Sequence, residues 1–124
     1  MSAIKDGRYP IELDKTRHLL FSLNILDELD DKAGGFDKLN EFIYPKQRVS
    51  FKNLKWLLTK LLNEGANEGD EELTESQVGR LIHLQNIKAV ADTIMKAFTF
   101  SVIGDDEPAD DLDDDEKNLT GGTA

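Results

Sequence analysis

The chain has 124 residues, of which 39% are hydrophobic and 32% are charged, and its formal net charge is -10. This length and hydrophobic content predict one folded domain rather than two. Because the chain has no cysteine, disulfides, thiol nucleophiles and thiolate zinc sites are excluded, which fits a reducing cytoplasm.

The negative charge is concentrated near the C-terminus. Residues 105–116 include nine acidic side chains and no basic one, which leaves 16 acidic and 14 basic residues up to Gly104. The nearly neutral charge of the residues up to Gly104 argues against a nucleic-acid partner, because phosphate binding needs clustered Lys and Arg. The sequence shows no secretory signal pattern and no apolar run near the ~20 residues of a membrane span. We therefore expect a soluble intracellular protein without a membrane partner.

The first structural signal follows a flexible lead-in that we expect over residues 1–8. Apolar and other residues alternate in 9–13, and Asp14-Lys15 can form a two-residue turn. Residues 16–21 can then return as the second strand of a hairpin, although the run RHLLF could equally begin a helix. Such a hairpin is marginal alone and must pack on helices.

Two shorter helices are expected next. Ser22 or Asn24 can cap the first, which Gly34-Gly35 would end. Its apolar face consists of Ile25, Leu26, Leu29 and Ala33. The second is expected over residues 36–42, before Tyr44-Pro45 breaks the chain.

The strongest helical signal runs from Phe51 to Gly65, with Ser50 at the N-cap and Gly65 as the stop. Its predicted buried arc consists of Phe51, Leu54, Leu57, Leu58, Leu61 and Leu62. After a polar linker, residues 74–77 match a capping box for a second helix, whose apolar positions are Val78, Leu81 and Ile82. We expect the domain to be arranged around this helix pair.

A last helix is predicted from residue 87 to the stop at Gly104, with Asn86 as its cap. Its apolar arc of about 160° consists of Ile87, Val90, Ala91, Ile94, Met95, Ala97, Phe98 and Val102. Residues 105–124 have the composition of a disordered acidic tail. The fold class is therefore mainly α: a small domain of four to five helices over residues 9–104, with or without an N-terminal β-hairpin.

Some large side chains do not fit these apolar arcs. Trp56 projects about 140° away from Phe51 on a helical wheel, and Phe100 and Ile103 lie outside the arc of the last helix. Either other segments bury them, which for Trp56 means the N-terminal segment or the last helix, or they contact a partner, where aromatic residues are enriched. The candidate partner-binding residues are Lys52, Trp56, Lys60, Phe100 and Ile103.

The sequence carries no catalytic, cofactor or metal motif. His18 and His83 each lack a second ligand at metal spacing, and no P-loop, dinucleotide or HExxH pattern is present. The alternating aspartates from Asp111 onward do not make an EF-hand, because its sixth and twelfth positions hold Glu116 and Gly122. We expect no enzyme, no cofactor and no metal site.

Three stretches taken in order, RHLLFSLNILDELDDKAGG, FKNLKWLLTKLLNEG and LTESQVGRLI, resemble the tail assembly chaperones of long-tailed bacteriophages of Gram-positive hosts. The resemblance covers about residues 9–98, and the Gly34-Gly35 pair and the acidic tail depart from the pattern. It implies a small, mostly helical protein of the host bacterial cytoplasm. Such a protein binds and solubilises the tape-measure protein during tail morphogenesis and is absent from the mature virion.

The resemblance also implies a longer form, made by a programmed frameshift, that recruits the major tail (tube) protein. An adenine-rich slip site can encode residues 116–118. Two other functions stay open: a small acidic regulatory or adaptor protein that binds and inhibits a host or phage protein through its tail, and a structural protein of the virion. Homo-oligomers are compatible with the apolar residues outside the arcs, although no heptad repeat is sustained.

Overall fold

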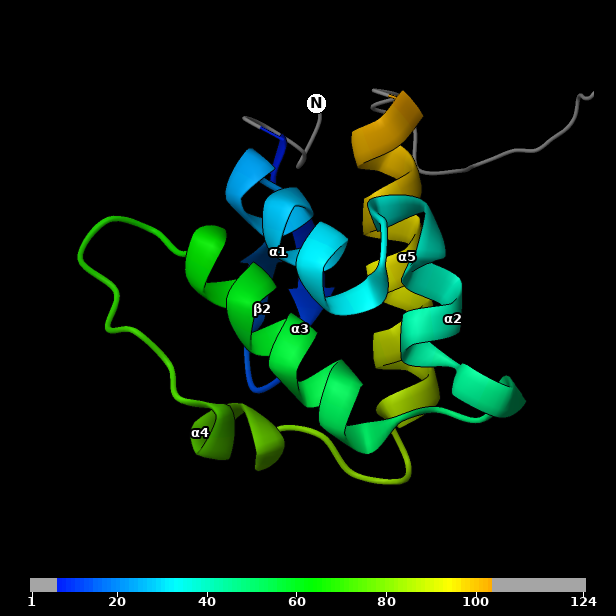
Figure 1. The fold of residues 1–124 in the computed structure, drawn as a ribbon. Coiled ribbons are helices and arrows are strands. Elements are labelled where there is room, and N and C mark those ends of the chain that lie inside the picture. Colours follow the sequence, from blue (N-terminus) through cyan, green and yellow to red (C-terminus); the bar gives the residue numbers. More distant parts are fainter. Residues whose placement is uncertain (1–6, 104–124) are drawn as a thin grey trace, which may run out of the picture.

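A computed structural model describes residues 7–103 of the chain (Figure 1). This part is mainly helical, with five α-helices and an N-terminal antiparallel hairpin of two strands. The predicted fold class is confirmed. Most of the expected lead-in and the whole expected acidic tail lie outside the described residues.

The hairpin pairs β1 (Tyr9–Glu12) with β2 (Thr16–Leu19), and Glu12 lies opposite Thr16 in its register. The run RHLLF therefore enters the hairpin and does not begin a helix. The connection has three residues, 13–15, and not the two that were predicted, because Leu13 is not part of the ladder. The guanidinium of Arg17 donates two hydrogen bonds to the Asp14 carboxylate, at 2.8 and 3.0 Å, and closes the turn.

Helix α1 (Leu23–Ala33) begins at the predicted cap, where the Ser22 hydroxyl accepts a hydrogen bond from the Ile25 backbone N–H. It ends at Gly34, whose φ of +85° is a left-handed conformation that glycine adopts with little strain. The predicted short helix is a 3-10 turn, Phe36–Lys38, that leads into α2 (Leu39–Ile43).

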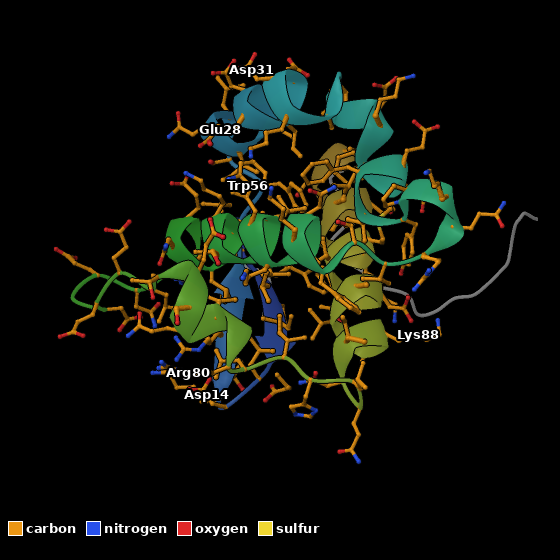
Figure 2. All side chains as sticks on the ribbon, turned by 60° about the horizontal axis from the view of Figure 1, so that its bottom comes forward. Asp14, Glu28, Asp31, Trp56, Arg80 and Lys88 are labelled. Carbon is orange, nitrogen blue, oxygen red and sulfur yellow. The ribbon has the colours of Figure 1, made fainter. Side chains whose placement is uncertain are left out.

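A second 3-10 turn, Pro45–Gln47, leads to the long helix α3 (Phe51–Glu64). Ser50 caps α3 as predicted, since its hydroxyl accepts from the Asn53 N–H at 3.2 Å. In Figure 2, α3 lies between α1 and α4. Its buried side chains are Leu54, Leu57, Leu58, Thr59, Leu61 and Leu62.

The C-terminal end of α3 meets the hairpin backbone to backbone. The N–H of Leu20 donates to the carbonyl of Leu61 at 3.3 Å. A Cβ atom at Gly65 would overlap the carbonyl oxygen of His18. The glycine that was predicted as a helix stop is therefore also needed for this close approach.

Helix α4 (Glu75–Gly79) is shorter than predicted. Its capping box is present, with Thr74 and Gln77 bonded to each other's backbone N–H. However, Leu81 and Ile82 lie beyond the end of this helix, so the expectation that they are two of its apolar positions is wrong. Gly79 is a poor helix residue and stands where the helix ends.

Helix α5 (Ile87–Ile103) is the predicted last helix. Asn86 hydrogen-bonds backward to the loop, accepting from the His83 N–H at 2.8 Å and donating to the Leu81 carbonyl at 3.0 Å. Val102 was expected to be buried and is 58% exposed, because the last turn of α5 stands beyond its neighbours in Figure 1.

The core lies where α1, α2, α3 and α5 meet the hairpin. Side chains with 1% exposure or less include Leu19, Ile25, Leu29, Leu39, Ile43, Leu54, Leu57, Leu58, Leu61, Val78 and Ile94. Over residues 7–103, none of the helices combines the length and the apolar character that a membrane crossing requires.

Candidate partner-binding surfaces

The five candidate partner-binding residues lie in different parts of the molecule. Lys52, Trp56 and Lys60 follow one another at four-residue spacing along one side of α3. Phe100 and Ile103 belong to the last turns of α5. The structure therefore does not bring all five together on one surface.

Trp56 is half-buried among residues of its own chain. Its ring packs edge-on against Phe42, with centroids 5.8 Å apart, and the Lys32 ammonium lies 4.8 Å from the ring centre. Figure 2 shows Trp56 between α1 and α3. The prediction that the N-terminal segment or the last helix covers the indole is wrong. The glycine turn after α1 returns α2 to this side of α3, so α1 and α2 provide the cover.

Lys60 belongs to the same cluster. Its ammonium lies 3.4 Å from the Glu28 carboxylate and 6.0 Å from the Trp56 ring centre. An exposed ion pair of this kind contributes only ~0–1 kcal/mol to stability. The cluster of Lys32, Trp56 and Lys60 thus has an intramolecular role in joining α1 to α3.

The two α5 residues differ in their surroundings. Phe100 is half-buried and packs against Tyr9, with ring centroids 6.0 Å apart, so it joins α5 to the hairpin. Burial raises the pKa of the Tyr9 hydroxyl. Ile103 is 67% exposed at the end of the described helix, next to the exposed Val102.

An open cleft of about 470 Å³ lies where the first turns of α3, the end of α4 and the start of α5 meet. Its apolar lining consists of Phe51, Leu54, Ile82, Leu84 and Ile87. The remaining lining residues are Lys52, Lys55, Gly79 and His83, so the lining contains no acidic residue. We call this feature the basal cleft.

Two large apolar side chains of the basal cleft are largely exposed. Phe51 was expected in the buried arc of α3, and this prediction is wrong because its side chain is 64% exposed. The reason is that α3 begins one turn before the core, and Leu54 is its first fully buried residue. Leu84 is 84% exposed and lies in the connection between α4 and α5.

Leu84 was not predicted as a partner-binding residue, because it lies outside every predicted apolar arc. A signal was nevertheless present, since a leucine within the polar run from His83 to Asn86 has no periodic partner to pack against. Lys52 is the one predicted candidate that lines the basal cleft.

A second groove, of about 500 Å³, lies between α1, α3 and the start of α4. It is lined by Glu28, Glu64, Glu72 and Glu75 together with Lys60 and several neutral residues. The side chains of residues 7–103 form no group of three His, Asp or Glu that could hold a metal ion. The basal cleft, with its apolar floor and basic flank, has the chemistry of a binding surface.

No protein-family model, curated protein or solved structure matches this chain. The resemblance to tail assembly chaperones therefore rests on the three sequence stretches themselves. They form β2 with α1, then α3, and finally α4 with the turns after it. The second and third stretches supply most of the lining of the basal cleft.

Proposed function

We propose that this chain is a phage tail assembly chaperone that binds and solubilises the tape-measure protein during tail morphogenesis and leaves before the virion matures. The observation that carries the proposal is the open, apolar basal cleft with exposed Phe51 and Leu84. The resemblance of the sequence stretches that build this cleft gives the class of partner.

The physical basis is the covering of apolar surface on the partner. Large apolar side chains clustered on a surface are typical of sites for protein partners. A long helical partner that exposes apolar stripes would aggregate, and a helix-in-groove contact covers such a stripe. Complete burial of Phe51 and Leu84 would contribute ~1.5–3 kcal/mol each.

Co-expression with the large helical protein encoded just downstream tests the proposal. We expect that partner to be soluble and to co-purify with the full chain, and equally with a chain that ends at Gly104. A partner that is indifferent to this chain would contradict the proposal. If capture is lost only when residues 105–124 are removed, the acidic regulatory or adaptor function is correct instead.

Two variants assign the capture to the basal cleft. Phe51→Asp combined with Leu84→Asp should lower the yield of soluble partner, because both side chains are exposed and lie in the cleft. Leu23→Asp is the matched control, since Leu23 is 81% exposed on α1 and does not line the cleft. Thermal melts of each variant establish that the fold is retained.

Mass spectrometry of purified particles tests the departure of the chaperone. We expect tape-measure peptides without peptides of this chain. Stoichiometric amounts of this chain in the particles would favour the structural-protein alternative.

A longer form would extend the proposal to a second partner, the major tail (tube) protein. Its signature lies in the gene: the codons for residues 116–118 should form an adenine-rich slip site that is followed by a long overlapping frame. If these codons are not adenine-rich and no overlapping frame follows, the longer form is not made. The proposed function of the short form would be unaffected.

A further inference from the structure

We infer that the basal cleft docks one amphipathic helix that presents apolar side chains on one face and carboxylates along one edge. The assignment of this helix to the tape-measure protein rests on the proposed function. The chemistry of the helix rests only on the cleft.

The walls of the cleft favour a helix over an extended peptide. They come from the first turns of α3, the end of α4, the connection between α4 and α5 and the first residue of α5, and neither strand of the hairpin contributes a lining residue. Strand addition requires an exposed sheet edge, which this cleft does not border. A helix can instead place apolar residues from successive turns against the exposed Phe51 and Leu84 and the half-buried Ile87.

The charge of the cleft selects an acidic edge. Lys52 and Lys55 line the cleft, and neither makes an ion pair with another residue of 7–103. By contrast, Lys60 and Lys88 are paired with Glu28 and Asp92, at 3.4 and 3.5 Å. Up to Gly104 the chain has 16 acidic and 14 basic residues, so two lysines without a carboxylate give the cleft a local excess of positive charge. Complementary charges across an interface favour the correct partner and its orientation.

Gly79 contributes to this arrangement. A Cβ atom at position 79 would lie 3.2 Å from Cδ of Lys55, so the glycine leaves room for the lysine stem against α4. Such a stem covers apolar surface while the ammonium group stays in water. Lys55 thus adds apolar contact area as well as a positive charge to the cleft.

The chain's own tail is a poorer occupant than an amphipathic helix. Residues 105–124 would complement the two lysines, but Leu112 and Leu119 are their only large apolar side chains. Two leucines offer less apolar surface than is needed to cover the exposed Phe51 and Leu84 together with the apolar floor. One segment must both neutralise the two lysines and cover the apolar side chains of the cleft. An amphipathic helix with an acidic edge does both.

Two synthetic peptides of about 18 residues, or five helical turns, test the inference. Both carry leucines at helical spacing, and one has Glu along an edge where the other has Lys. Fluorescence anisotropy with the full chain should show that the Glu peptide binds at least about tenfold more tightly, as ~1.4 kcal/mol of charge complementarity would give. Lys52→Glu with Lys55→Glu should reverse this preference.

Lys38→Glu with Lys96→Glu is the matched control for net charge. Both lysines are exposed and lie outside the cleft, so this variant should keep the preference for the Glu peptide. Phe51→Asp with Leu84→Asp should weaken binding of the Glu peptide by more than about tenfold. Equal affinities for both peptides, or an equal effect of the two double lysine variants, would overturn the inference.

Other occupants of the cleft have their own signatures. A rise of more than about tenfold in affinity for the Glu peptide after removal of residues 105–124 would place the tail in the cleft and overturn the inference. A dimer in light scattering that Phe51→Asp dissociates would place a second copy there and also overturn it.

Two experimental outcomes distinguish the docking site from the proposed function. If the Glu peptide binds as described while the downstream protein is not solubilised, the docking site stands and the chaperone function fails. If the downstream protein co-purifies equally well with Phe51→Asp plus Leu84→Asp, the chaperone function stands and the docking site is wrong.

Discussion

At the scale of single residues, Gly65 shows how a sequence signal can be correct for an incomplete reason. A glycine after the last periodic residue indicates a helix stop, and α3 does end there. Its φ of -91° is accessible to any residue, so no left-handed conformation explains the glycine. The explanation is the His18 carbonyl, which occupies the position of a side chain. This contact between distant segments has no counterpart in local sequence.

Gly65→Ala is therefore expected to destabilise the fold by ~1–3 kcal/mol, as overpacking of a well-packed site does. Gly79→Ala is the control, because its new methyl would meet only the flexible stem of Lys55 and would improve helix propensity. Urea unfolding measures both variants. Equal stability of Gly65→Ala and the parent chain would show that the hairpin does not lie this close to α3.

The ion pair of the hairpin turn has a predictable pH dependence. The hydrogen bonds from Arg17 hold the pKa of the Asp14 carboxyl below its ordinary value. A depressed pKa in the folded state stabilises the protein above the unfolded pKa of ~3.9, and this contribution is lost as the pH falls through the folded pKa. Because the Asp14 carboxylate is exposed, we expect at most ~1 kcal/mol.

Asp14→Asn should accordingly lower the melting temperature slightly at pH 7, and the difference from the parent chain should shrink as the pH falls below ~3.9 and vanish below the folded pKa of Asp14. Thermal melts across this range measure the difference. A gap between the two proteins that stays constant with pH would mean that the carboxylate charge does not stabilise the turn.

At the scale of elements, the sequence predicted where helices begin better than how far they extend. Ser22, Ser50 and Thr74 each cap the helix assigned to them, because an N-cap depends on residues within one turn. The end of α4 was not predicted, since the apolar spacing of Val78, Leu81 and Ile82 fits a helix as well as the observed non-helical segment. The exposed ends of α3 and α5 depend on where the core stops, which periodicity does not encode.

Asn63 connects two elements through a contact that was not predicted from the sequence. Its side-chain amide donates to the Leu73 carbonyl at 3.0 Å and accepts from the Leu73 N–H at 2.8 Å, which attaches the linker before α4 to α3. Asn63→Ala should cost ~1–3 kcal/mol, because it leaves partly buried backbone groups unpaired.

Limited proteolysis checks this expectation, since cleavage between residues 66 and 72 should become faster in Asn63→Ala. Asn40→Ala serves as the control, because Asn40 is exposed on α2. An unchanged cleavage rate in the linker would show that other contacts hold it in place.

The contact between α5 and the hairpin yields a further prediction. Phe100 packs on Tyr9 and is half-buried, so Phe100→Ala should cost about half of the ~3–5 kcal/mol that is typical for a core Phe. Calorimetry measures this loss. Capture of the partner should be unchanged at a temperature where the variant is folded. If Phe100→Ala has normal stability but fails to capture the partner, Phe100 contacts the partner and does not serve mainly to join α5 to the hairpin.

At the scale of the whole molecule, the sequence was sufficient for the fold class and insufficient for the surface. Caps, apolar arcs and the alternating strand define the hairpin and most helices locally. The basal cleft arises where three segments of the chain meet, and its lining residues extend from 51 to 87, which are 36 positions apart in the sequence. Of the five predicted contact residues, Lys52 alone lines it. Phe51 is identified as a candidate by its exposure, and the exposure of Leu84 gives a meaning to its isolated place in a polar run.

The most direct test of the account is hydrogen exchange of this chain, free and in complex with the partner encoded downstream. Exchange measured by mass spectrometry reports which backbone amides become protected. The account predicts that protection on binding is concentrated in residues 51–55 and 82–88, around the basal cleft. Protection confined to residues 27–32 and 56–60, with none at the cleft, would contradict it and place the partner on the face that holds Trp56.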